Sequence, residues 1–208
     1  MPADPAPIEI SSAPGPEDQA RANFYALLSR LFYAAPDKDL LDAIARNREI
    51  DVVGENVALG AAWRALQQAS AGADIAATQQ EYDDLFIGTG KAAVTLFTSH
   101  YLTAAGREKV LVRLRDELDD LGLARRSGAR EPEDHVAGLF DVMRFLIVAE
   151  SMDHALQKQQ RFFQHYVASC YGDLCDAITL AHGGNYYRQV ARFAKAFLDV
   201  EAQALAMI

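Results

Sequence analysis

Basic residues are in deficit in this 208-residue chain, because 29 aspartates and glutamates stand against 20 lysines and arginines. The formal net charge is −9 at pH 7. General nucleic-acid-binding proteins carry a basic patch that faces the phosphates, so this composition predicts no nucleic-acid partner. The composition is compatible with a cationic partner, whose approach an acidic surface accelerates.

Long apolar runs and cysteines are scarce as well. The longest strongly apolar run, Phe145 to Ala149, is far shorter than the roughly 18 residues that a membrane-spanning helix needs, so no stable membrane insertion is predicted. The two cysteines, Cys170 and Cys175, have neither the spacing of a CxxC site nor the number that a disulfide framework requires. We interpret Cys170 as a small core residue rather than a nucleophile.

Proline is concentrated at the N-terminus, where residues 1–16 hold five of the seven prolines. The same stretch has neither the basic region nor the apolar region of a secretory signal, so we expect a cytoplasmic protein. Residues 1–15 are interpreted as a flexible tail, because their composition cannot bury enough apolar surface to fold.

Alternating strand patterns are also missing, whereas apolar residues recur with helical spacing along most of the chain. The clearest stripe consists of Val136, Leu139, Phe140, Met143, Leu146 and Ile147. We therefore predict an all-α fold, a single helical bundle-like domain of about eight or nine helices. It would have one helical part at 16–86, a hinge at 87–97 and a second helical part at 98–208.

The hinge region includes the end of the motif EYDDLFIGTGK at 81–91, which looks like part of a phosphate-binding loop. A Walker A loop would need a glycine at position 85 and a hydroxyl at position 92, and those positions hold Leu85 and Ala92. We interpret the first half as a helix end beside a groove that binds a peptide through apolar anchors. The predicted anchors are Tyr82, Leu85 and Phe86, and the predicted hinge residues are Gly88, Thr89 and Gly90.

A dense charged cluster, EPEDH at 131–135, precedes the clearest apolar stripe. One interpretation is a helix start, with a proline at the first helical position and carboxylates at the positive end of the helix dipole. The other is a binding site, because such carboxylates can receive arginines of a partner through charge-assisted hydrogen bonds. The predicted binding residues here are Glu131, Pro132, Glu133, Asp134 and His135.

Patterns for metal binding or catalysis are weak. Glu150 and His154 form an i,i+4 pair, but no Glu-x-x-His sequence accompanies it. No nucleophile elbow is present in the sequence either. We predict no metal site, no cofactor and no catalytic residue. A further acidic group is interpreted as a solvated helix face and consists of Asp116, Glu117, Asp119 and Asp120.

Three segments together resemble the TorD/DmsD/NarJ family of redox-enzyme maturation chaperones. EYDDLFIGTG at 81–90 resembles the helix end and hinge of that family, and EPEDH at 131–135 matches its E-P-x-D-H motif. RANFYALLSRLFYAAPDKDLLDAI at 21–44 resembles its first helix pair. Thr89 stands where the family usually has a proline, and His165 is not followed by the Pro-Trp that the family often has.

The resemblance implies an all-helical chaperone without catalytic activity. Its implied partners are the twin-arginine signal peptide and the apo-form of a molybdopterin oxidoreductase subunit, with a formate dehydrogenase or a DMSO-reductase-family enzyme as candidate clients. Binding in the cytoplasm would delay export through the Tat translocon until the molybdenum cofactor is inserted. A glycine-containing hinge at 88–90 would also permit a domain-swapped homodimer.

In this interpretation the acidic residues of 131–135 meet the two arginines of the leader. The apolar residues of 82–86, together with Phe97, meet the apolar stretch that follows the arginines. Two other functions stay open on sequence grounds. One is a helical interaction or regulatory domain for another cytosolic partner, and the other is a metal- or nucleotide-dependent hydrolase that uses the histidines.

Overall fold

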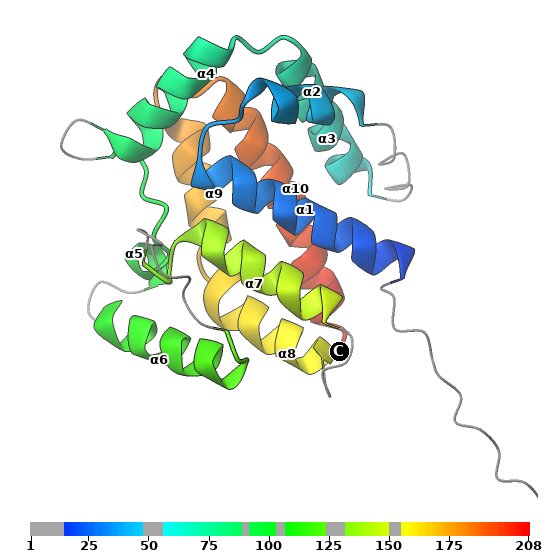
Figure 1. The fold of residues 1–208 in the computed structure, drawn as a ribbon, viewed down its shortest axis with the longest axis vertical. Helices are drawn as coiled ribbons and strands as arrows, with labels where there is room; N and C mark the ends of the chain where they lie inside the picture. Colours follow the sequence, from blue (N-terminus) through cyan, green and yellow to red (C-terminus); the bar gives the residue numbers. More distant parts are fainter. Residues whose placement is uncertain (1–14, 48–55, 89–91, 103–106, 124–131, 150–154) are drawn as a thin grey trace, which may run out of the picture.

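The computed structural model describes residues 15–47, 56–88, 92–102, 107–123, 132–149 and 155–208. These residues form ten α-helices and a single isolated β-bridge, so the predicted all-α class is confirmed (Figure 1). The predicted number of about eight or nine helices is close to the ten that the described residues form, of which α5 has only four residues.

Three helices begin at the start signals that the sequence carries. Pro16 occupies the first position of α1, and the side chains of Asp37 and Asp74 cap α2 and α4 by accepting backbone hydrogen bonds. Two short π-helical segments, η2 and η3, extend α4 and α8. The elements are α1 (Pro16–Tyr33), α2 (Lys38–Arg46), α3 (Val57–Ala71), α4 (Ile75–Tyr82), η2 (Asp83–Ile87), α5 (Ser99–Leu102), α6 (Arg107–Asp120), α7 (Val136–Val148), α8 (Ala155–Phe162), η3 (Phe163–Val167), α9 (Tyr171–Leu180) and α10 (Tyr186–Leu205).

Two long packing interfaces join the N-terminal and C-terminal helices. α1 lies along α7. α10 packs against α1, α3 and α4 of the N-terminal part and against α8 and α9 of the C-terminal part. Figure 1 shows α10 behind α1, with α2, α3 and α4 at one end of the molecule and α6 and α8 at the other. Helices that are far apart in the sequence are therefore neighbours in space.

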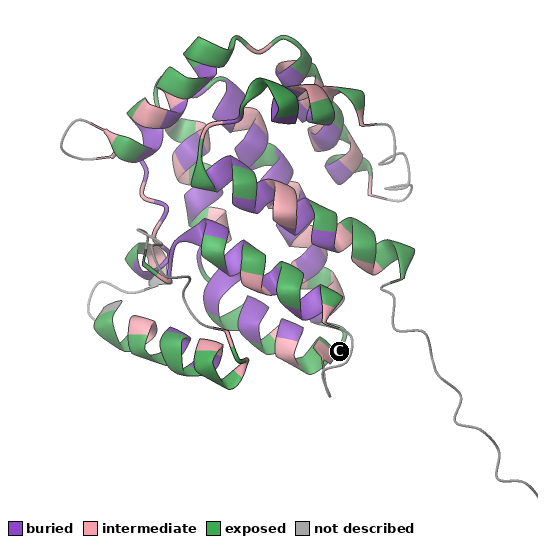
Figure 2. Ribbon diagram, in the orientation of Figure 1, coloured by how far each residue is buried: buried purple, intermediate pink, exposed green. Residues whose placement is uncertain are grey.

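A single hydrophobic core results from this packing. Its cluster of buried side chains includes Tyr25 and Phe32 of α1, Phe140 of α7, and Tyr187 and Phe193 of α10. Buried residues lie along the inward side of the helices (Figure 2). The predicted parts 16–86 and 98–208 thus contribute to one core, and the hinge between them stays a prediction.

α7 begins later than the sequence predicts. The helix-start interpretation places Pro132 at the first helical position, but the helix starts at Val136. His135 is its N-cap, and Nδ1 of His135 accepts a hydrogen bond from the backbone of Ala137 at 3.3 Å. The reason is long-range pairing. His135 has an extended backbone, and the Asp134 carbonyl and the Val136 N–H bond to Thr98 and Leu96. These groups are therefore not available to a helix that begins at Pro132.

The acidic group on α6 is only partly a solvated face. Asp116, Asp119 and Asp120 are exposed, as predicted. Glu117 is 9% exposed, and its carboxylate accepts a hydrogen bond from Arg161 of α8 at 2.8 Å. The interpretation of Glu117 as a solvated residue is therefore wrong, because Arg161 of α8 binds its carboxylate.

Both cysteines lie in the core. Burial raises the pKa of Cys170 to about 12 and that of Cys175 to about 12, so both thiols stay protonated at neutral pH. This agrees with the interpretation of Cys170 as a core residue rather than a nucleophile. Within the described ranges, no helix is both long enough and apolar enough to span a bilayer.

Candidate functional site

The helix end of the first motif is fixed to α1. The hydroxyl group of Tyr82 donates a hydrogen bond to the carbonyl oxygen of Tyr33 at 2.8 Å. The ring centroid of Phe86 lies 5.2 Å from that of Tyr82 and 5.0 Å from that of Tyr187 in α10. These contacts place two aromatic side chains of the motif where α1, α4 and α10 meet.

The chain leaves this helix end through a glycine conformation. The backbone N–H of Gly88 donates to the carbonyl of Asp83 at 2.7 Å, which closes the π-helical turn. Gly88 has φ 64° and ψ 157°, a region that is essentially restricted to glycine. The direction of the chain after η2 therefore depends on this residue. The other two predicted hinge residues, Thr89 and Gly90, lie outside the described residues.

The segment 92–98 follows the first motif in the chain and lies against the second motif in space. Its Leu96 carbonyl accepts a hydrogen bond from the backbone of Val136 at 2.9 Å. Phe97 and His135 form an isolated antiparallel bridge, and their ring centroids are 5.5 Å apart. Backbone pairing thus holds the EPEDH cluster against the segment that follows the helix end.

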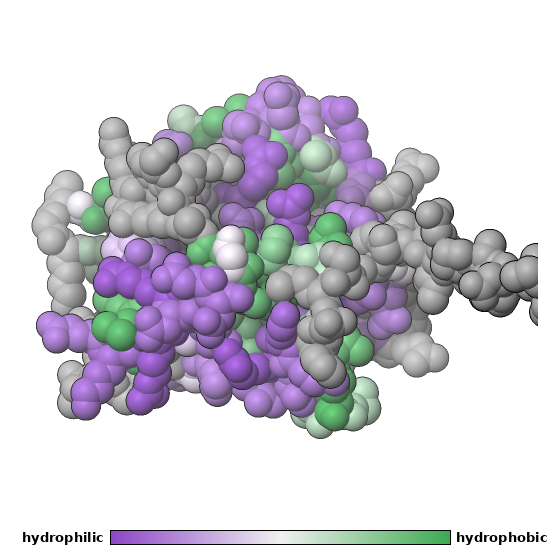
Figure 3. Space-filling view, turned by 60° about the horizontal axis from the view of Figure 1, so that its bottom comes forward, coloured by the Kyte–Doolittle hydropathy of each residue, from purple (hydrophilic) through white to green (hydrophobic). Residues whose placement is uncertain are grey.

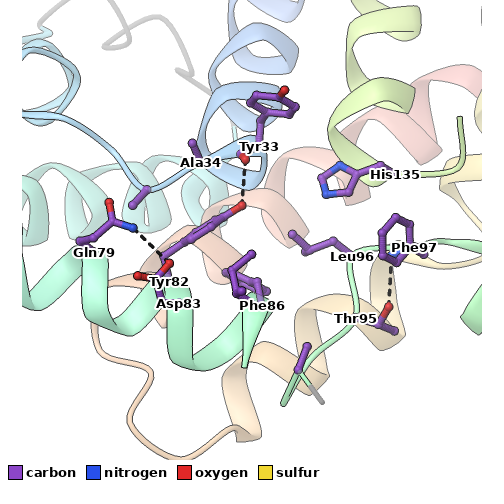
Figure 4. A pocket seen from close by; sticks show the side chains of 13 residues that line it. Tyr33, Ala34, Gln79, Tyr82, Asp83, Phe86, Thr95, Leu96, Phe97 and His135 are labelled. Atoms are coloured by element: carbon purple, nitrogen blue, oxygen red, sulfur yellow. Dashed lines mark hydrogen bonds between the residues drawn. The ribbon is translucent and has the colours of Figure 1, made fainter. Parts of the chain in front are cut away.

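A pocket of about 380 Å³ opens between the two motifs. Tyr82 and Phe86 lie on one side of it, and His135 and Phe97 lie on the other (Figure 4). The residues that line it are Tyr33, Ala34, Ala35, Gln79, Tyr82, Asp83, Phe86, Ile87, Ala92, Thr95, Leu96, Phe97 and His135. Most of this lining is aromatic or aliphatic, with a few hydrogen-bonding groups.

The predicted apolar anchors do not all reach this pocket. Tyr82 and Phe86 line it, and so does His135 of the second motif. Leu85, the third predicted anchor, is 2% exposed and belongs to the hydrophobic core. Pro132 is exposed in the turn that precedes α7.

The acidic residues of the cluster differ in their surroundings. Asp134 is 2% exposed, and its carboxylate accepts a hydrogen bond from the backbone of Ser99 at 3.2 Å. It therefore positions one wall of the pocket. Glu133 is half-buried and accepts a hydrogen bond from Arg115 of α6 at 3.1 Å. Glu131 lies outside the described residues.

Several residues that line the pocket are not among the predicted site residues. Tyr33 is 61% exposed, and its ring centroid is 6.5 Å from that of His135. Its only signal in the sequence is an aromatic residue at the end of a helix, outside the apolar stripe. Asp83 adds a carboxylate to the lining and accepts a hydrogen bond from Gln79 at 3.2 Å.

The glutamate that opens the first motif has a structural role. The carboxylate of Glu81 accepts hydrogen bonds from the backbone N–H groups of Tyr187 at 2.7 Å and Tyr186 at 3.1 Å. These groups belong to the first turn of α10, where helix N–H groups have no partner within the helix. Glu81 thus joins α4 to α10 just behind the pocket.

Metal-binding chemistry finds little support in the described part of the chain. There, no three His, Cys, Asp or Glu side chains are grouped so that they could hold a metal ion. Glu150 and His154, the pair that suggests a metal in the sequence, lie outside it. What the pocket offers is aromatic surface and a few hydrogen-bonding groups, which is an arrangement for binding.

Comparison with known proteins agrees with this arrangement. The model of the nitrate reductase delta subunit family matches residues 55–176, which include both motifs that border the pocket. The chain belongs to this family. A curated relative, the chaperone protein TorD of Shewanella loihica, is 22% identical over 204 residues, which cover 91% of this chain and 95% of that protein.

The predicted place among the TorD/DmsD/NarJ redox-enzyme maturation chaperones is therefore confirmed. Membership of this chaperone family implies a protein without catalytic activity. Residues of both family motifs line the pocket, so the pocket is the candidate binding site of this family member.

Proposed function

We propose that this family member is a cytoplasmic chaperone for a molybdenum-cofactor oxidoreductase. It would bind the twin-arginine signal peptide of the client subunit, its apo-form, or both. The observation that supports this most is the apolar pocket between the two motifs. Binding would hold the client until its cofactor is inserted and would delay its export through the Tat translocon. The proposed client is a formate dehydrogenase or another DMSO-reductase-family enzyme.

The walls of the pocket suit the apolar stretch of a leader peptide. Peptide-binding grooves take up aromatic and aliphatic anchor side chains. At about 380 Å³ the cavity is near the small end of the roughly 300–1,000 Å³ range of ligand pockets, so we expect it to receive single side chains. Tyr33 and Ile87, each 61% exposed, would extend the apolar contact along the peptide.

The acidic groups near the pocket suit the two arginines of the leader. Asp83 lines the pocket, and Glu133 lies two residues before His135, which also lines it. Carboxylates bind guanidinium groups through charge-assisted, often bidentate hydrogen bonds. The net charge of −9 would accelerate the encounter with a cationic leader.

Calorimetric titration of the full chain with a synthetic twin-arginine leader tests the proposal. Tyr33→Ala should weaken binding roughly tenfold or more, because truncating an aromatic anchor removes a large part of the affinity of an interface. Leu180→Ala is the matched control, since Leu180 is 81% exposed on α9 and is not part of the pocket lining.

The outcomes separate the parts of the proposal. If Tyr33→Ala and Leu180→Ala bind the leader equally well, the pocket is not the binding site. If the wild-type chain does not bind the leader, the signal peptide is removed from the proposal. Co-purification of the apo-subunit with the chain then tests the remaining part.

A further inference from the structure

One carboxylate of the EPEDH cluster already holds a guanidinium group. Nη2 of Arg115, on α6, lies 3.1 Å from Oε2 of Glu133. The glutamate side chain is 13% exposed, whereas the arginine side chain is 55% exposed. The carboxylate is therefore largely sheltered, and the cation that binds it comes from the solvent side.

The neighbouring acid of the cluster has a different kind of partner. The Asp134 carboxylate accepts a backbone hydrogen bond from Ser99, and its own carbonyl accepts one from Thr98. Those partners belong to the folded backbone and cannot be exchanged without moving the pocket wall. The partners of Glu133 include a long, flexible side chain, that of Arg115. Of these two acids, Glu133 is the one whose cation can be exchanged by a side-chain rotation.

α6 itself is held in place independently of this ion pair. Leu114 is fully buried, and Glu117 accepts a hydrogen bond from Arg161 of α8 at 2.8 Å. Figure 3 shows the face on which α6 lies, and the outward side of the helix is mostly hydrophilic. Release of Arg115 from Glu133 would leave these two anchors intact and would place a charged side chain in water.

We propose that Arg115 is an internal stand-in for an arginine of the client, and that Glu133 exchanges one for the other when the leader binds. This inference rests on the proposed function of the pocket. An ion pair with an exposed guanidinium contributes little free energy, so replacing Arg115 by another arginine costs little. A leader arginine matches the carboxylate as well as Arg115 does, whereas a lysine ammonium lacks the bidentate fork and competes poorly.

The test is a calorimetric titration of the full chain with a twin-arginine leader and with its Lys-Lys version. Arg115→Gln should bind the twin-arginine leader about two- to fivefold more tightly than the wild type, which is the range of an exposed ion pair. The Lys-Lys version should remain the weaker ligand of the variant, because its ammonium groups lack the bidentate fork. Arg113→Gln is the matched control, because Arg113 is exposed on the same helix and the charge change is identical.

A double-mutant cycle assigns the effect to the carboxylate. In the background of Glu133→Gln, the Arg115→Gln change should leave the affinity for the leader unchanged, because there is nothing left to compete for. Equal affinities of Arg115→Gln and Arg113→Gln, with a wild type that binds, would overturn the inference and leave the proposed function intact. Failure of the wild type and both variants to bind the leader would overturn the inference and remove the signal peptide from the proposed function, whose apo-subunit part is tested by co-purification.

Discussion

At the residue scale, a buried ion pair outside the pocket lining joins α1 to α10. Nε of Arg21 in α1 donates to Oε1 of Glu201 in α10 at 2.7 Å, and the second guanidinium nitrogen reaches Oε2 at 2.9 Å. Tyr25 also donates to this carboxylate, at 3.0 Å. Burial and the charge of Glu201 raise the pKa of Tyr25, so its hydroxyl group stays protonated and remains a donor.

Replacing Arg21 should destabilise the fold strongly. Arg21→Ala would leave Glu201, which is 2% exposed, without its cation, and we expect the free energy of unfolding to fall by about 3–5 kcal/mol. Urea unfolding followed by circular dichroism measures this change. Arg30→Ala is the control on the same helix, because its pair with Asp37, at 3.5 Å, is exposed and should contribute under about 1 kcal/mol. Similar losses for both variants would contradict the prediction.

The same scale separates the acids of the second motif. Their density predicts a charged site, and only their surroundings distinguish them. Asp134 binds the backbone inside the fold, whereas Glu133 binds the exposed side chain of Arg115. The sequence offers no sign of this difference, because both residues precede the same helix.

At the element scale, α10 depends on another helix for its N-terminal cap. Its N-cap residue, Asn185, makes no side-chain capping hydrogen bond. The carboxylate of Glu81, at the end of α4, accepts from the first two N–H groups of the helix instead. A negative charge at this point also interacts favourably with the helix dipole.

Weakening this remote cap should loosen the start of α10. Glu81→Gln keeps the size of the side chain but removes its charge and one acceptor, and we expect a loss of about 1 kcal/mol in the free energy of unfolding. Hydrogen exchange of the Tyr187 amide should become faster. Asp84→Asn is the control, since Asp84 is exposed on the adjoining η2 segment. An unchanged exchange rate at Tyr187 in Glu81→Gln would exclude the capping role.

The helices themselves follow from local sequence. All six residues of the stripe from Val136 to Ile147 are buried in α7, as their spacing predicts. Asp37 and Asp74 cap the helices that they precede. The start of α7 is the exception. There, the bonds that decide the structure come from residues 96–98, and no local pattern reveals them.

At the scale of the whole molecule, the two helical parts are joined by α1 on α7 and by the shared core. A hinge at 87–97 would therefore have to separate large buried surfaces before it could open. The domain-swapped homodimer also stays a prediction. It would need the same opening and would then re-form these interfaces between two chains.

The acidic charge of the molecule predicts a salt-dependent affinity for the leader. Raising sodium chloride from about 50 mM to about 500 mM should weaken binding of a twin-arginine leader several-fold, because screening acts on exposed charges. The apolar contact in the pocket should survive. A leader with glutamines in place of both arginines is the control, and its affinity should change much less. If calorimetry gave the same salt dependence for the two peptides, the charge of the two arginines would play no part in binding.

The sequence by itself determined the all-α class, the starts of α1, α2 and α4, the apolar stripe of α7 and the family. These properties are encoded over a few turns of helix or in short motifs, so neighbouring residues suffice to specify them. Only the tertiary structure decided which motif residues are accessible. Packing of α1, η2 and segment 92–98 against the start of α7 brings Tyr33 beside His135, buries Leu85 and Asp134, and leaves Glu133 with Arg115. Such contacts join residues far apart in the chain, where spacing and composition carry no information about distance.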